Sequence, residues 1–119
     1  MATELKPTVS KEETFDKLDI RLGRVVSIEY EESAPKKAYK ITVDFGKFGT
    51  KVSVGRFTNH DIDTMKGSLV LGVLNFGSTM IGDTESEVLI LGVQYPKKDS
   101  GEATFITPAV DAKIGGKLF

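Results

Sequence analysis

Strict alternation of apolar and polar residues between Tyr39 and Phe45 constrains the fold more than any other feature of this chain. Every second residue of this stretch is apolar, and the residues between them are polar. A period of two indicates a β-strand with one buried face. Residues 49–55 repeat the pattern, and 46–49 supply a glycine-bounded turn. The sequence therefore predicts a β-hairpin at the centre of the protein.

The flanking segments predict further strands and two short helices. Residues 18–30 also alternate, and a shift at Gly23 to Val25 predicts a bend or a bulge in one long strand. Ile62 and Met65 are three residues apart within 58–67, where Gly67 can end a short helix. The other expected elements, in chain order, are a leading helix at 11–17, strands at 68–76 and 86–93 joined by a loop at 77–85, a polar loop at 96–102 and an extended piece at 103–107.

Three strands, a short helix and two more strands follow the order of an OB-fold, an all-β, five-stranded Greek-key barrel with a helix between strands three and four. A small sandwich or an SH3-like barrel has a similar strand count. The length suits one hydrophobic core. We therefore expect an N-terminal extension at 1–14 and one barrel domain at 15–119.

Composition narrows the possible chemistry. The absence of cysteine excludes disulfides, thiolate nucleophiles and cysteine-bound zinc, and it suits a reducing compartment, so we expect a cytoplasmic protein. No segment has the length of a signal peptide core or a membrane span. The net charge is −1, but residues 21–60 hold an excess of basic over acidic side chains. This local excess could attract an anionic partner if folding gathers it on one face.

Catalytic and metal-binding patterns are not evident. His60 is the only histidine, so HDID at 60–63 makes a poor transition-metal set, and acidic residues at a helix start explain it better. GKFGTK lacks the spacing of a phosphate-binding loop, and no serine lies in a nucleophile elbow. We expect no enzyme activity, no metal and no cofactor.

Three ordered blocks carry a family resemblance: FDKLDIRLGRVVSIE at 15–29, SAPKKAYKITVDFG at 33–46 and VLNFGSTMIGDTESEVLILG at 73–92. Together they resemble the stand-alone tRNA-binding domain family, the OB-fold module also found appended to some aminoacyl-tRNA synthetases. The CsaA-like branch of small dimeric proteins is the closer match. The resemblance extends from Phe15 to the C-terminus.

The resemblance implies a barrel face that holds tRNA or another structured RNA, with basic groups on phosphates and polar groups on exposed bases. From the residues alone, Arg21 could instead pair with Asp19 or Glu29, and the lysines could form an ordinary solvated loop. Phe48 is the one aromatic residue in a turn that could stack on a base. The expected RNA-contacting residues are Arg21, Lys36, Lys37, Lys40, Arg56, Asn75 and Ser86.

One loop departs from the family pattern. Thr79 occupies the position of a family arginine, and Asp83 and Glu85 add negative charge nearby. Fewer phosphate contacts mean weaker binding. The apolar Met80 and Ile81 suit a soft polypeptide contact, so the alternative function is a CsaA-like chaperone for unfolded or pre-export polypeptides.

The resemblance also implies a homodimer. Residues 11–19 and 106–119 could form a self-complementary contact, because the C-terminal segment is more apolar than a free tail requires.

Overall fold

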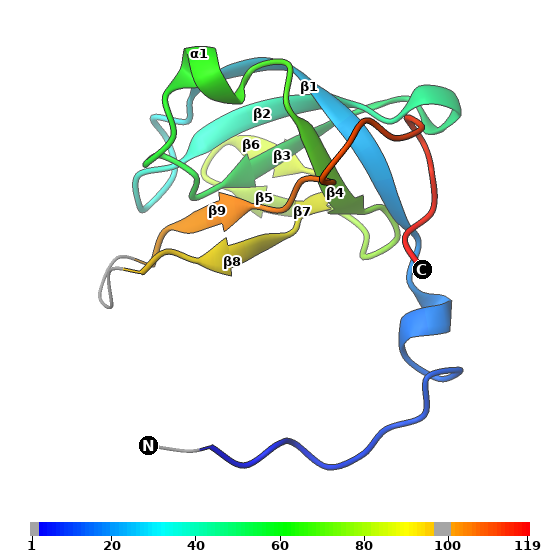
Figure 1. Cartoon of the computed structure of the whole chain (residues 1–119). Coiled ribbons are helices and arrows are strands. Elements are labelled where there is room, and N and C mark those ends of the chain that lie inside the picture. Colours follow the sequence, from blue (N-terminus) through cyan, green and yellow to red (C-terminus); the bar gives the residue numbers. More distant parts are fainter. Residues whose placement is uncertain (1–2, 97–100) are drawn as a thin grey trace.

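The five central strands form an OB-like barrel, shown in Figure 1, in a computed structural model that describes residues 3–96 and 101–119. All neighbouring strands pair antiparallel in the order β3-β2-β1-β4-β7. The placement of β1 between β2 and β4 confirms the predicted OB-like barrel. The five strands are β1 Ile20–Tyr30, β2 Tyr39–Asp44, β3 Thr50–Gly55, β4 Leu69–Val73 and β7 Leu89–Ile90.

β1 belongs to two halves of the barrel. Its first half pairs with β4 and its second half with β2, and the pairing register shifts between Val25 and Ser27. The predicted bulge is therefore present, slightly later than Gly23 to Val25. Gly23 has a different purpose: a Cβ there would lie 2.4 Å from Cγ1 of Val43, so only glycine lets β1 pass this close to the core.

Short helical turns close the ends of the barrel. α1 Ile62–Met65 follows β3, and its fully buried Met65 reaches the core. Gly67 ends this segment with φ +87°, as the sequence predicts. In the predicted leading helix only η1 Phe15–Lys17 forms, as a 3₁₀ turn, and η2 Gly46–Phe48 occupies the predicted hairpin turn.

The predicted loop at 77–85 and the single strand at 86–93 are both wrong. β5 Thr79–Ile81 and β6 Thr84–Ser86 pair as a hairpin, and Gly82 supplies the positive φ of its turn. After β6 the chain changes partners: β7 joins β4, and β8 Gly92–Gln94 pairs with β9 Ala103–Phe105. A continuous apolar run does not reveal where a strand changes partner. Residues 97–100 of the predicted loop at 96–102 lie outside the described part.

The core follows the alternation in β2. Ile41, Val43 and Phe45 are fully buried, and Val25 and Val70 pack with them from β1 and β4. Phe45 is thus a core residue, as expected for an aromatic at an alternating position.

The N-terminal segment leaves the body of the barrel. Residues 3–14 lead away from it in Figure 1, and Leu5 and Val9 are exposed. Within residues 3–96 and 101–119, no helix is long and apolar enough to cross a membrane.

Candidate nucleic-acid interface

A surface groove begins at the loop between β1 and β2 and follows β3. We call residues 34–38 of this loop the lysine turn, because Lys36 and Lys37 are both exposed on it. Two adjoining hollows of about 250 and 260 Å³ form the groove and share Val54 and Ile81. The lining residues are Ala34, Pro35, Lys36, Ala38 and Arg56 near the turn, and Phe76, Gly77, Thr79, Ser86, Val88 and Leu89 at the far end.

The tip of the β5–β6 hairpin is fastened to the loop that carries the lysine turn. The Glu31 carboxylate accepts hydrogen bonds from the hydroxyls of Ser33 and Thr84, and the Ser33 hydroxyl accepts one from the Asp83 N–H at 2.8 Å. Gly82 lies so close that a Cβ would be 2.4 Å from the Ser33 Oγ. We call this contact the clasp. The clasp gives the groove two fixed walls.

The clasp also sets the charge state of Glu31. Hydrogen bonds from Ser33 first, and then from Thr84, lower the pKa of the Glu31 carboxyl below its ordinary value, and the positive charge of Lys40 adds to the effect. Hydrogen bonds to a carboxylate favour its charged form. The closed clasp therefore favours the ionised form of Glu31.

Ser86 and Glu87 close the barrel on the floor of the groove. The Ser86 Oγ accepts a hydrogen bond from the Val54 N–H at 3.0 Å, and Glu87 Oε1 accepts one from the Val52 N–H at 3.0 Å. The Glu87 N–H donates back to the Val52 carbonyl at 2.7 Å. Glu87 thus bonds to the backbone of β3 through both its carboxylate and its N–H. Ser86 is both a groove residue and a structural one.

Arg56 positions the lysine turn. Its Nε donates to the Lys37 carbonyl at 3.3 Å, Nη1 donates to the Gly101 carbonyl at 3.1 Å, and Nη2 forms an ion pair with Glu102 at 3.1 Å. Glu102 is 8% exposed and also accepts from the N–H and hydroxyl of Thr58. The guanidinium of Arg56 therefore lines the groove but is committed to internal partners.

Lys40 lies next to the turn on the outer face of β2. It is paired in register with Glu29 on β1 and with Val54 on β3. Its charge therefore acts partly on neighbouring glutamates, whereas Lys36 and Lys37 extend from the turn into solvent.

Arg21 is not brought to the groove. It lies eight positions before Glu29 on β1, roughly 25 Å along the strand. Its Nε bonds Asp19 at 2.6 Å, its Nη1 donates to the Gly115 carbonyl at 3.4 Å, and its guanidinium lies 4.5 Å from the Phe48 ring centre. Pairing with Asp19, one of the two alternatives from the sequence, is what the structure shows. Phe48 is equally remote from the groove.

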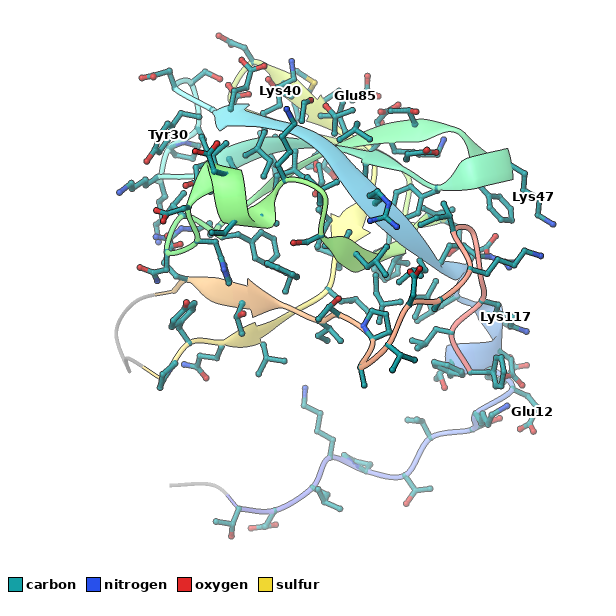
Figure 2. The ribbon with its side chains drawn as sticks, turned by 45° about the horizontal axis from the view of Figure 1, so that its top comes forward. Glu12, Tyr30, Lys40, Lys47, Glu85 and Lys117 are labelled. Atoms are coloured by element: carbon teal, nitrogen blue, oxygen red, sulfur yellow. The ribbon has the colours of Figure 1, made fainter. Side chains whose placement is uncertain are left out.

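Asn75 joins two segments at the same end of the barrel as Arg21. Its Oδ1 accepts a hydrogen bond from the Asp19 N–H at 2.8 Å, and its Nδ2 donates to the Lys17 carbonyl at 2.9 Å. Both polar atoms of the amide are therefore used to hold η1 against the end of β4. In Figure 2, Lys47 and Lys117 lie at this end, well separated from Tyr30 and Lys40.

His60 has a packing role. Its Nε2 lies 3.0 Å from the Thr104 hydroxyl, and its ring packs on Phe105 and Tyr95 at centroid distances of 4.8 and 5.9 Å. Asp61 begins α1 without a side-chain cap, so the expected capping bond is absent. Across the part of the chain that the structure describes, no three His, Cys, Asp or Glu side chains are grouped to hold a metal ion.

Sequence reasoning missed Tyr30 and Phe76. Tyr30 continues the alternation of Val26 and Ile28, which suggests a buried position, yet it is 47% exposed at the end of β1. Phe76 is 61% exposed at the far end of the groove. Tyr30 is the last residue of β1, and Phe76 follows β4 by three residues, so both lie where a strand gives way to a loop, and that position is the signal that could have identified them.

Comparison with known proteins finds similarity to methionine–tRNA ligases in sequence and to CsaA proteins in structure. No family model matches the chain. It is 30% identical over 115 residues to a methionine–tRNA ligase of Archaeoglobus fulgidus, and 34% identical over 112 residues to that of Methanoculleus marisnigri. These alignments cover 97% and 94% of this chain but only 17% and 16% of the ligases.

A solved structure matches the whole fold. The CsaA chaperone protein from Picrophilus torridus superposes with a TM-score of 0.85 at 29% identity, and the match covers 94% of this chain and all of that one. The chain is thus similar in sequence to a segment of methionine–tRNA ligases and similar in structure to CsaA proteins.

Proposed function

We propose that the protein binds RNA, and that a single-stranded or loop segment of tRNA or another structured RNA lies in the groove. The observation that carries this proposal is a walled groove lined by the exposed Lys36, with the exposed Lys37 next to it on the lysine turn. Basic groups beside a groove that admits bases are the usual arrangement of single-strand binding barrels. The similarity to segments of tRNA ligases supports the same ligand.

The protein acts by binding, and the proposal assigns it no catalytic step, metal or cofactor. Phosphates lie against Lys36 and Lys37, bases enter between β3 and the β5–β6 hairpin, and the Ser86 hydroxyl faces them from the floor. Arg56 contributes by holding the Lys37 carbonyl, and Arg21 and Asn75 contribute to stability.

A salt titration of tRNA binding tests the proposal. The double variant Lys36→Ala with Lys37→Ala removes two phosphate contacts. The slope of log K against log salt concentration should therefore become less negative by about 1.4 for a single-stranded segment. The matched control is Lys47→Ala with Lys117→Ala, which removes the same charge at the other end of the barrel and should leave the slope nearly unchanged. Absence of tRNA binding by the unmodified protein at low salt would remove the proposal.

Polypeptide binding is the second candidate, and one observation favours it. Phe76 and Leu89 line the far end of the groove and are 61% and 49% exposed, so this end of the groove offers apolar surface. The structural relative is named a chaperone. If this candidate holds, the protein suppresses aggregation of a model unfolded protein, and Phe76→Ser with Leu89→Ser abolishes the effect.

We also propose that the protein is a homodimer. An apolar hollow of about 520 Å³ lies beneath the C-terminal segment, where Leu22, Leu71 and Leu118 line it. Val110 and Phe119 are 78% and 100% exposed beside this region. A second copy that covers this surface would bury both, and light scattering at micromolar concentration should give twice the chain mass. A monomer mass would contradict this proposal.

A further inference from the structure

We propose that Tyr30 and Lys37 form a second subsite, on the opposite side of the lysine turn from the groove, that stacks one unpaired nucleobase. This inference rests on the proposed RNA binding and extends it to Tyr30, which is not among the predicted RNA-contacting residues.

The subsite is a separate hollow of about 240 Å³. Tyr30 lies at one side of it, and the exposed Lys36 and Lys37 lie at the other. Its remaining lining residues are Glu31, Glu32, Ala34, Pro35 and Ala38. Four residues, Ala34, Pro35, Lys36 and Ala38, line both this hollow and the groove. The lysine turn therefore forms a low wall between two compartments.

The Tyr30 ring is held in place from beneath. It packs against Tyr39 in an edge arrangement, with ring centroids 5.1 Å apart and planes at 64°. Tyr39 is 2% exposed, and its hydroxyl donates to the His60 carbonyl at 2.7 Å. Burial raises the pKa of the Tyr39 hydroxyl, so it keeps its proton and this bond at neutral pH. A fixed, half-exposed aromatic ring gives a base a platform with little ordering cost.

The charges around the ring suit a nucleotide better than a bare anion. The Lys37 ammonium lies 6.0 Å from the Tyr30 ring centre, and Lys36 projects from the wall itself. A strand that crosses the turn from the groove can therefore place a phosphate on the lysines and its next base on Tyr30. Glu32 is exposed in the hollow, where its carboxylate repels a second phosphate and accepts hydrogen bonds from base N–H groups. Glu31 is occupied by the clasp.

The chain contains no tryptophan, so Tyr30→Trp creates a single fluorescent reporter at the subsite. We expect a short oligoadenylate to quench this fluorescence saturably, because a stacked base contacts the indole directly. Inorganic polyphosphate of similar charge binds the lysines without a base, and it should leave the fluorescence nearly unchanged.

Affinity measurements give the second readout. Tyr30→Ala should weaken oligoadenylate binding about fivefold to 100-fold, the effect of removing one base–aromatic stack, while Tyr30→Phe should bind like the unmodified protein. Phe119→Ala, which removes an exposed aromatic residue at the other end of the barrel, serves as the control and should not weaken binding.

The possible results separate this inference from the proposed function. If oligoadenylate binds and the Lys36/Lys37 double variant loses affinity, but Tyr30→Ala binds normally and Tyr30→Trp is not quenched, the subsite is overturned and RNA binding in the groove stands. If oligoadenylate and tRNA both fail to bind at low salt, both proposals fall. Should Tyr30→Ala fail to fold by circular dichroism, quenching of the folded Tyr30→Trp protein decides the question.

Discussion

The two ends of the barrel use basic residues in opposite ways. At the end with the lysine turn, the ammonium groups of Lys36 and Lys37 form no ion pair with any described residue. At the other end, Arg21 bonds Asp19, the Gly115 carbonyl and the Phe48 ring. Free charges can exchange counterions for phosphates, whereas paired charges hold the fold together. Whether a basic residue has an internal partner, rather than its charge alone, therefore indicates whether it stabilises the fold or is available to a ligand.

Glu102→Ala should have the largest effect, because it breaks the ion pair that holds Arg56 at the lysine-turn end. The change leaves the Arg56 guanidinium and the Thr58 N–H without their carboxylate in a nearly buried site, so we expect the free energy of unfolding to fall by about 2–4 kcal/mol. Thermal unfolding measures this. Glu85→Ala, on the exposed side of β6, is the control and should be neutral. An unchanged melting temperature for Glu102→Ala would show that Arg56 does not anchor the turn.

Arg21→Ala should lower the stability of the protein and leave its tRNA affinity nearly unchanged, which is the opposite of what we expect for the Lys36/Lys37 double variant. Loss of the Asp19 pair and of the contact with Phe48 should lower the free energy of unfolding by about 1–2 kcal/mol, with little change in tRNA affinity. Denaturant unfolding and tRNA titration on the same sample test both parts. A loss of tRNA affinity equal to that of the Lys36/Lys37 double variant would erase the distinction between the two ends.

Thr79→Arg should add an unpaired positive charge to the groove, and so it tests whether such a charge increases the affinity for tRNA. Thr79 is exposed and lines the far end of the groove, so an arginine there can reach a phosphate. We expect tRNA affinity to rise about threefold to tenfold, with a steeper dependence on salt. Ser78→Arg is the control, since Ser78 does not line the groove. Equal gains from both variants would mean that only overall charge matters.

Lowering the pH should weaken the hydrogen bonds of the clasp. We expect this effect to be smaller than those of Glu102→Ala, Arg21→Ala and Thr79→Arg. The hydrogen bonds from Ser33 and Thr84 hold the pKa of Glu31 below its ordinary value, so the contribution of the clasp is complete at neutral pH and is lost as pH falls through that lowered pKa. The NMR signal of the Asp83 amide, which bonds Ser33, should shift over this range. Glu31→Gln should remove the transition, and an identical shift in that variant would assign it to another group.

The sequence predicts the strands well because burial imposes a period of two on them. Tyr39 to Phe45 and the shift near Gly23 identify β2 and the bent β1 without any knowledge of tertiary contacts. The run at 86–93 fails because it is apolar at nearly every position, so it carries no sign that β6, β7 and β8 bond to different strands. A local sequence pattern indicates which residues are buried, whereas the choice of a partner strand depends on residues that are distant in the sequence.

The candidate site is predictable only where charge lies on a loop. Lys36 and Lys37 stand on a turn, and the structure leaves them exposed there. Arg56 is also basic, but its partner Glu102 is 46 positions away in the sequence. No local sequence pattern indicates that pairing. Tyr30 is missed for the same reason, because its exposure depends on where the β1–β2 loop turns back.

The barrel is closed beside β6 by the side chains of two consecutive residues, Ser86 and Glu87, in place of a long backbone ladder. Because these two residues follow β6, the hydrogen bonds that close the barrel are separate from those of the clasp at the hairpin tip. A change at the tip therefore acts first on the wall of the groove, while the closure on β3 is held by other side chains.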